Sequence, residues 1–266
     1  MLFPLSMEVK LGSNFSCIRL STLLQGRRRA YLFASPPNLR DNFRKGFKTF
    51  ASRKSERKRR KDSQVEVASR SAVLQACFFT SAALLLLGVL IRQVSHLACI
   101  NGLPILDATE VKFGFEIWHI ELVLALVVLI SSSRYILLKA WPDFAESSEA
   151  ANQQVLSSLE PVDLVLVAFL PGISEEFLFR GGLMPIFGLD WKSALASGAI
   201  FGILHLSGGR KYSYTIWATI VGFAYGLATV ASSSLVVPMV SHSLNNLIGG
   251  LFWYLNSNSI SEEKLK

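Results

Sequence analysis

The chain has few of the residues that cross-link or charge an ordinary soluble domain. Only three of its 266 residues are cysteines, and Cys17, Cys77 and Cys99 show no CxxC spacing. The sequence therefore predicts free thiols, with neither a disulfide framework nor a zinc knuckle. Charged residues make up just 17% of the chain, whereas 51% of it is hydrophobic. This composition excludes an ordinary soluble domain and predicts a membrane protein.

The few charges are unevenly distributed. Residues 1–62 contain 16 Lys and Arg against 4 Asp and Glu, whereas the rest of the chain contains 11 against 15. This basic segment is rich in Arg and Ser and lacks the uninterrupted apolar core of a secretory signal peptide. We interpret it as a disordered transit peptide, with the chloroplast preferred over the mitochondrion or endomembranes. A basic tail kept on the mature protein is the alternative, and no nucleic-acid partner is predicted, although residues 53–61 are strongly basic.

Long apolar segments begin after this basic region. The first, 72–91, has 20 residues, which at about 1.5 Å per residue cross a hydrocarbon core of about 30 Å. A second apolar segment covers 117–138, and a polar, helix-favouring stretch covers 141–154. The remaining apolar segments are 162–187, 193–206, 213–231 and 234–255. The predicted fold is all-α, a multi-pass bundle of about six to seven transmembrane helices in a lipid bilayer.

Small residues recur in two of the later segments. Residues 198–202 read "GAIFG" and residues 222–226 read "GFAYG". Both are GxxxG motifs, which allow the backbones of two helices to approach closely in lipid. We expect these glycines to lie at helix contacts.

Three apolar segments contain polar groups that are costly in a membrane span. They are "SEEFLFR" at 174–180, "FGILH" at 201–205 and "SHSLNN" at 241–246. Ionisable residues within a span usually face a cavity or the interior of the bundle, and they often mark function. The sequence therefore predicts that these segments meet inside the bundle.

The first of these stretches divides into a pair and a single carboxylate. On a helix Glu176 and Arg180 are four residues apart and share a face, in the favourable order for an ion pair. Glu175 is rotated from Glu176 by about 100°, so its partner must come from another helix. We expect Pro171–Gly172 to break or begin a helix, which would place both glutamates near a first turn, where the helix dipole favours carboxylates.

The other two stretches supply histidines and an amide. His242 and Asn246 are four residues apart, so both can donate hydrogen bonds towards one point. His205 stands alone and has two interpretations, interhelical hydrogen bonding or function. A buried carboxylate with a histidine can deprotonate water, and imidazole and amide donors can stabilise an oxyanion. Together these groups could hydrolyse an amide without a covalent intermediate.

Other hydrolytic chemistries have less support. The chain has no GxSxG motif for a serine nucleophile and no HExxH motif for a metalloprotease. A zinc site from Glu175, His205 and His242 is conceivable because zinc accepts two histidines and a glutamate. The spacing does not require it, so no cofactor is predicted.

The three motifs together resemble a known family. "EEFLFR" fits EExxxR, "FGILH" fits FxxxH and "HSLNN" fits HxxxN. In this order they resemble the CPBP intramembrane proteases, which include type II CAAX prenyl endopeptidases and Abi-like bacteriocin-processing or immunity proteins. The resemblance covers about 162–255 and implies a helical membrane bundle with an interior cavity. Together with the transit-like segment at 1–62, it predicts a plant organellar member of the family.

The resemblance also implies roles for the residues of these motifs. Glu175 would be the general base and act with His205 on water. His242 and Asn246 would form the oxyanion hole. The supporting pair would be Glu176 and Arg180.

These observations predict a membrane endopeptidase that cleaves membrane-associated proteins or peptides. The alternative is a non-proteolytic scaffold or chaperone that protects partner membrane proteins and keeps the same residues as polar contacts between helices. The predicted organisation is a basic segment at 1–62, N-terminal membrane helices with a polar connecting helix at 63–160, a catalytic membrane domain at 161–256 and a polar tail at 257–266.

Overall fold

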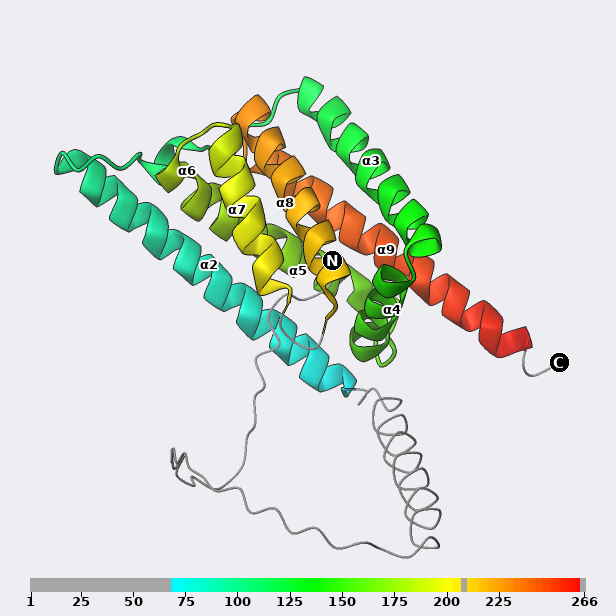
Figure 1. Cartoon of the computed structure of the whole chain (residues 1–266). Coiled ribbons are helices and arrows are strands. Elements are labelled where there is room, and N and C mark those ends of the chain that lie inside the picture. Colours follow the sequence, from blue (N-terminus) through cyan, green and yellow to red (C-terminus); the bar gives the residue numbers. More distant parts are fainter. Residues whose placement is uncertain (1–67, 207–209, 264–266) are drawn as a thin grey trace, which may run out of the picture. The chain divides into compact units, whose positions relative to one another are not determined.

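The computed structural model describes residues 68–206 and 210–263, and these residues form helices with no strand among them (Figure 1). The all-α prediction is confirmed. The predicted transit segment at 1–62 lies outside the described residues. The helices are α2 (Arg70–Ile100), η1 (Ala108–Glu110), α3 (Trp118–Ala140), α4 (Pro142–Leu156), α5 (Asp163–Glu176), the π-helical η2 (Phe177–Leu183), α6 (Met184–Phe187), α7 (Trp191–Leu204), α8 (Tyr212–Ser232) and α9 (Val236–Glu263). Helix α9 therefore runs into the segment predicted as a polar tail.

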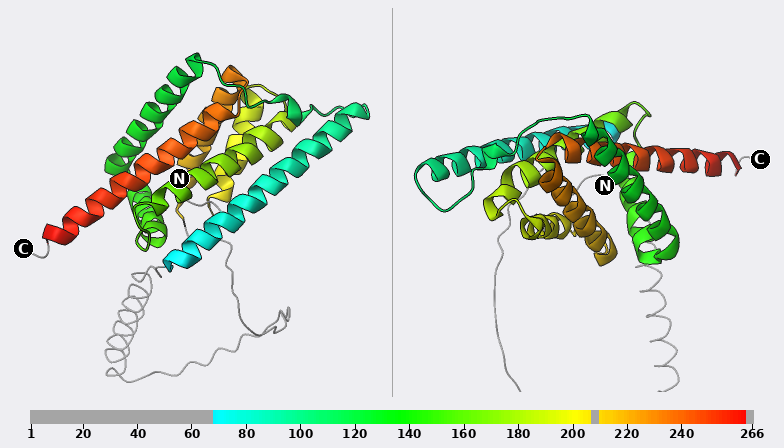
Figure 2. Two further views of the ribbon diagram at one scale, coloured as in Figure 1. Left: turned by 180° about the vertical axis from the view of Figure 1, so that it is seen from behind. Right: turned by 90° about the horizontal axis from the view of Figure 1, so that it is seen from above.

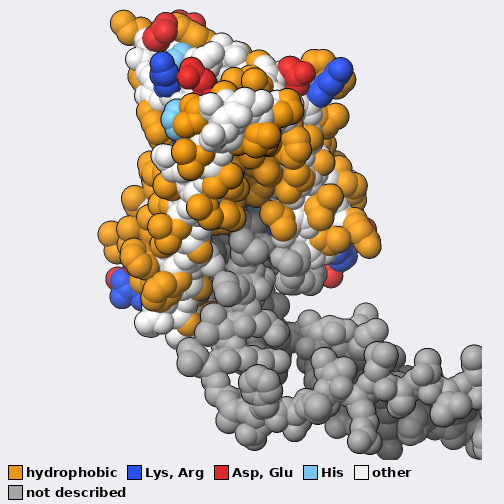
Figure 3. Space-filling model, turned by 90° about the vertical axis from the view of Figure 1, so that its left-hand side faces the viewer, with side chains coloured by type: hydrophobic (Ala, Val, Ile, Leu, Met, Phe, Trp, Pro, Cys, Tyr) orange, Lys and Arg blue, Asp and Glu red, His pale blue; other side chains and the backbone are white. Residues whose placement is uncertain are grey.

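Helices form most of every predicted apolar segment. Within the described residues α2, α3 and α8 are long and apolar enough to cross a membrane, and α7 is a shorter apolar helix. Large apolar side chains on the outer face of α2 are exposed, among them Phe79 and Leu86. Figure 3 shows hydrophobic side chains over the α2 side of the molecule, with charged side chains gathered at its two ends. This distribution is the one expected of a bundle surrounded by lipid.

Helix α9 occupies the middle of the arrangement. It packs against α5, α3, α8 and α4, and the two views of Figure 2 show it running between α3 and α5. The polar stretch predicted at 141–154 is helical, as expected, and forms α4. One face of α4 packs into the bundle, because Phe144 is fully buried and its ring centre lies 6.1 Å from that of Tyr214.

The prediction that Pro171–Gly172 breaks or begins a helix is wrong. Both residues lie inside α5, and Glu175 and Glu176 form its C-terminal end rather than a first turn. The chain then continues without a break into the π-helical η2. The positive end of a helix dipole therefore does not stabilise these carboxylates, and any stabilisation has to come from side chains.

Contacts with α9 explain why α5 continues through this pair. A proline within a membrane helix is tolerated where neighbouring side chains satisfy nearby backbone groups. Here Asn246 Nδ2 donates to the Ala168 carbonyl at 3.4 Å, close to the turn that Pro171 interrupts. A Cβ atom on Gly172 would lie 2.9 Å from the Ser243 backbone nitrogen, so the glycine permits close contact between α5 and α9.

The two GxxxG motifs lie at one helix contact, as predicted. Helices α7 and α8 lie side by side (Figure 1). A Cβ atom on Gly198 would lie 2.7 Å from the Phe223 nitrogen, and one on Gly226 would lie 2.8 Å from Ala194 Cβ. The absence of side chains at these positions allows the two backbones to approach.

We expect Gly202→Ala to destabilise this contact. The added methyl group would lie 2.8 Å from the Thr215 carbonyl oxygen, a backbone atom that cannot rotate away. Overpacking of this kind costs about 1–3 kcal/mol of unfolding free energy. Gly114→Ala is the control, because nothing lies within 4 Å of its new methyl group. Thermal unfolding of both variants in mild detergent tests the expectation, and equal midpoints would contradict it.

Candidate active site

The six predicted site residues lie in or next to four helical elements. Glu175 and Glu176 end α5, Arg180 lies in η2, His205 follows α7, and His242 and Asn246 belong to α9. Their exposed fractions are 0% for the first five and 1% for Asn246. Burial of so many polar groups is unfavourable unless they are paired or hydrogen-bonded. The partners of each side chain therefore decide what the site can do.

Arg180 and Glu176 form the ion pair that their spacing predicts. Arg180 Nη1 lies 3.1 Å from both carboxylate oxygens of Glu176. Its Nη2 donates to the Gly222 carbonyl on α8, and its guanidinium lies 5.1 Å from the centre of the Phe201 ring. This arginine thus joins η2, α7 and α8 while it neutralises one glutamate.

His242 connects the two glutamates. Its Nδ1 lies 2.8 Å from Glu176 Oε1, and its Nε2 lies 3.8 Å from Glu175 Oε2. Because the carboxylate paired with Arg180 can only accept, Nδ1 carries the proton, and Nε2 is the atom that faces Glu175. The Tyr225 ring stacks on this imidazole and fixes its plane. The two ring centres are 5.1 Å apart, and the angle between the ring planes is 24°. The result is a chain of groups from Arg180 through Glu176 and His242 to Glu175.

Glu175 is the last side chain in this series of contacts, and it lacks hydrogen-bond partners among the described residues. Within residues 68–206 and 210–263 neither of its carboxyl oxygens has a hydrogen-bond partner. The 3.8 Å separation from His242 Nε2 is too long for a direct hydrogen bond. A buried carboxyl group without a partner is costly, so this position favours function over stability.

His205 and Asn246 lie next to this network of side chains. His205 Nδ1 donates to the Phe201 carbonyl at 2.7 Å, which leaves Nε2 as a buried acceptor without a hydrogen-bond partner in the described part of the chain. The centre of the Phe201 ring lies 4.4 Å from the centre of the His205 imidazole and 6.1 Å from that of the His242 imidazole. Asn246 lines a cavity beside His242.

The alternative zinc site is not assembled in this structure. Among the residues that the structure describes, no three His, Cys, Asp or Glu side chains gather as metal ligands. The Nδ1 atoms of His205 and His242 are engaged by Phe201 and Glu176, and the Phe201 ring contacts both imidazoles. A metal ion bound by either histidine would therefore have to be held by its Nε2 atom.

Sequence reasoning missed Tyr225 and Asn245. The Tyr225 hydroxyl accepts a hydrogen bond from Asn245 Nδ2 at 3.0 Å, and Asn245 Oδ1 accepts one from Ser131 at 2.7 Å. The GxxxG motif held a signal, because Tyr225 lies three residues after Gly222 and so shares its helix face. The adjacent asparagines of "SLNN" could not be distinguished by sequence, since either can face the interior.

An all-α membrane bundle with a buried carboxyl and imidazole site is the class of protein that the fold and these residues define. Residues 157–248 match the family model of type II CAAX prenyl endopeptidases, Rce1-like. This match supports the CAAX protease family for residues 157–248, which include all six site residues predicted from the sequence. Among the curated proteins and the solved structures, no match to the chain was found.

Proposed function

We propose that this protein is an intramembrane endopeptidase that hydrolyses peptide bonds of membrane-associated proteins. The observation that carries the proposal is Glu175, a fully buried carboxyl group whose oxygens have no hydrogen-bond partner in the described residues. It faces His242, which is itself held by the Glu176–Arg180 pair. Residues 157–248 match a family of membrane endopeptidases, which agrees with this chemistry.

In the proposed reaction Glu175 is the general base. It takes a proton from a water molecule as the water oxygen attacks the scissile carbonyl carbon, and the carbonyl oxygen becomes an oxyanion. The proton then passes from Glu175 to the leaving nitrogen as the C–N bond breaks. His205 is assigned to orient the water, because its buried Nε2 can accept a hydrogen bond.

His242 and Asn246 are assigned to stabilise the oxyanion. A neutral His242 with its proton on Nδ1 presents an acceptor at Nε2, so it can donate to an oxyanion only as an imidazolium. Glu176, at 2.8 Å from Nδ1, stabilises that charged form. The supporting role given to Glu176 is therefore specific: it allows His242 to donate when negative charge develops.

A non-proteolytic scaffold or chaperone is the rival function. The chain of contacts from Arg180 to His242 links α5, η2, α8 and α9, so it would also stabilise a bundle without catalysis. The Glu175 carboxyl group distinguishes the two functions, because its oxygens have no hydrogen-bond partner in the described chain. A scaffold does not need that group, whereas hydrolysis does.

A Glu175→Gln line compared with wild type tests the proposal in the organism. We expect the variant protein to accumulate normally and fail to complement a null mutant, because the amide cannot accept the proton of water. Proteomics of new N- and C-termini should then show a set of cleavage products that depends on Glu175. Full complementation by a normally folded variant would support the scaffold instead.

We also propose an organelle membrane as the location, with the chloroplast preferred. The support is the composition of residues 1–62, which contain 16 basic against 4 acidic residues. Failure of these residues to direct a fused reporter protein into isolated chloroplasts would exclude this location.

A further inference from the structure

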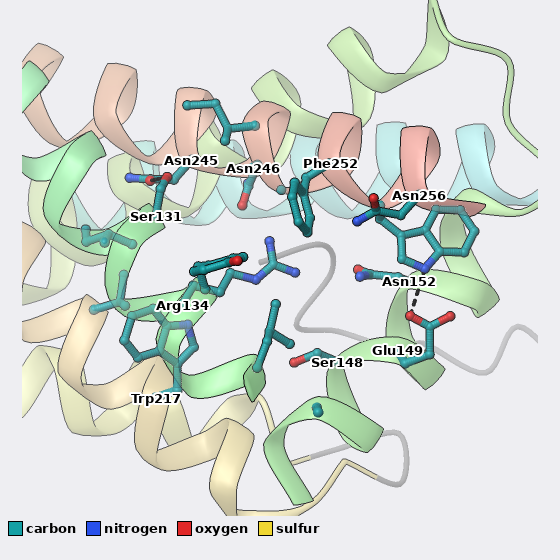
Figure 4. A pocket seen from close by; sticks show the side chains of 18 of the residues that line it. Ser131, Arg134, Ser148, Glu149, Asn152, Trp217, Asn245, Asn246, Phe252 and Asn256 are labelled. Carbon is teal, nitrogen blue, oxygen red and sulfur yellow. Dashed lines mark hydrogen bonds between the residues drawn. The ribbon is translucent and has the colours of Figure 1, made fainter. Parts of the chain in front are cut away.

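A cavity of about 310 Å³ lies among α3, α4, α8 and α9 (Figure 4). Aromatic side chains form part of its wall, among them Tyr135, Trp217 and Phe252. Tyr135 and Phe252 are 46% and 48% exposed, so the cavity borders the lipid-facing surface of α3 and α9. An apolar chain could therefore enter it from the bilayer.

The guanidinium of Arg134 points into the middle of this cavity (Figure 4). Within the described residues Arg134 has no ion pair and no hydrogen bond, although it lies in a largely apolar setting. It packs directly on α9, where a Cβ atom on Gly249 would collide with Nη1. A positioned arginine without an acidic partner is suited to a ligand that brings the negative charge.

The acidic residue of the cavity wall does not supply that charge. Glu149 is exposed, and its oxygens accept hydrogen bonds from Gln153 and from the Trp253 indole, each at 2.9 Å. Both of its carboxylate oxygens are thus engaged outside the centre of the cavity. Arg134 is left without a counter-ion among the described side chains.

Two further donors on α4 line the same cavity. Ser148 and Asn152 are four residues apart and share a helix face. Ser148 is 1% exposed, and its hydroxyl has no partner in the part of the chain that the structure describes. Asn152 is 9% exposed and makes no hydrogen bond to a described residue. In Figure 4 both side chains lie on the same side of the cavity, across from Asn246.

We propose that this cavity binds an anionic amphiphile, a membrane fatty acid or phospholipid. Its carboxylate or phosphate would pair with Arg134 and accept hydrogen bonds from Ser148 and Asn152, and its acyl chain would lie against the aromatic wall. Arg134 lies six residues before the end of α3, roughly 9 Å along the helix, so its charge lies near the membrane interface, where lipid headgroups are.

This occupant would lie beside the proposed catalytic residues. His242 and Asn246 line the same cavity, so a bound acyl chain would compete for space with a peptide approaching them. The lipid site itself rests on Arg134 and α4 and does not depend on proteolysis. A catalytically inactive chain should bind the same ligand.

The test measures binding to the full chain in non-ionic detergent by native mass spectrometry. The probes are laurate, lauryl alcohol and lysophosphatidylglycerol; the first two share a chain length and differ in charge. We expect wild type to bind laurate about tenfold or more tightly than lauryl alcohol, because hydrogen bonds to charged groups contribute about 1.5–3 kcal/mol. Arg134→Gln should reduce this preference to about twofold or less. Lys192→Gln, which removes an exposed charge on α7, should keep it.

Two further measurements identify the class of anion and keep the test valid if one variant does not fold. Tighter binding of lysophosphatidylglycerol than of laurate would assign the site to phospholipid, and the reverse to fatty acid. Ser148→Ala, a small change, should weaken binding of the preferred anion a few-fold even if Arg134→Gln does not fold. Equal binding of laurate and lauryl alcohol by wild type would overturn the proposal. So would Arg134-dependent binding of a peptide with a free carboxyl terminus but of neither lipid.

Discussion

Glu175→Gln is expected to reduce peptide-bond hydrolysis by the purified protein by about 10²–10⁴-fold, the usual contribution of a general base. The amide has nearly the same shape as the carboxyl group and cannot take a proton from water. No hydrogen bond is lost, because the Glu175 oxygens have none within the described residues. Folding should therefore be unaffected, and the loss should appear in the rate.

The assay compares initial cleavage rates of wild type and variant on a substrate identified by terminal proteomics. Glu121→Gln is the matched control, because Glu121 is an exposed glutamate on α3. Its activity should equal that of wild type. If Glu175→Gln cleaves at the wild-type rate, the carboxyl group is not the base and the proposed mechanism fails.

Arg180→Met is expected to destabilise the folded protein by about 3–5 kcal/mol, the range measured when one partner of a buried ion pair is removed. Methionine has a suitable length and leaves the Glu176 carboxylate without its cation. The Gly222 carbonyl also loses its side-chain donor, and the Phe201 ring loses the guanidinium that lies 5.1 Å from it. The penalty arises mainly from an uncompensated buried charge.

A double variant separates this cause from loss of packing. Glu176→Gln combined with Arg180→Met removes both charges, so it should be more stable than Arg180→Met alone when unfolding is followed in mild detergent. Lys192→Met, which removes an exposed charge, should stay within about 0.5 kcal/mol of wild type. If the double variant is less stable than Arg180→Met, the charge explanation is wrong.

Local spacing predicted some of this site correctly. Glu176 and Arg180 pair because residues four apart share a helix face, and this holds even though the chain passes from α5 into η2 between them. The glycine motifs likewise predicted the α7–α8 contact, since small residues are required wherever two backbones approach. Both inferences depend on relations that are fixed within a few residues of chain.

Inferences that involved a second helix were less successful. Pro171 was expected to begin or break a helix, but side chains of α9 satisfy and pack against this part of α5. The spacing of His242 and Asn246 predicted a shared helix face, but it did not reveal that His242 Nδ1 binds Glu176 and that Nε2 faces Glu175. A single sequence does not specify such partners, because they depend on how helices rotate and cross.

The sequence by itself determined that this is a helical membrane protein, that its polar motifs lie in apolar segments and that one of two adjacent glutamates pairs with Arg180. Those properties follow from composition and from the 3.6-residue period of a helix. Only the tertiary structure decided that His242 links Glu176 to Glu175, and that Arg134 and α4 form a cavity beside them. These contacts join residues far apart in the chain, so they exist only once the packing of the helices has fixed which faces meet.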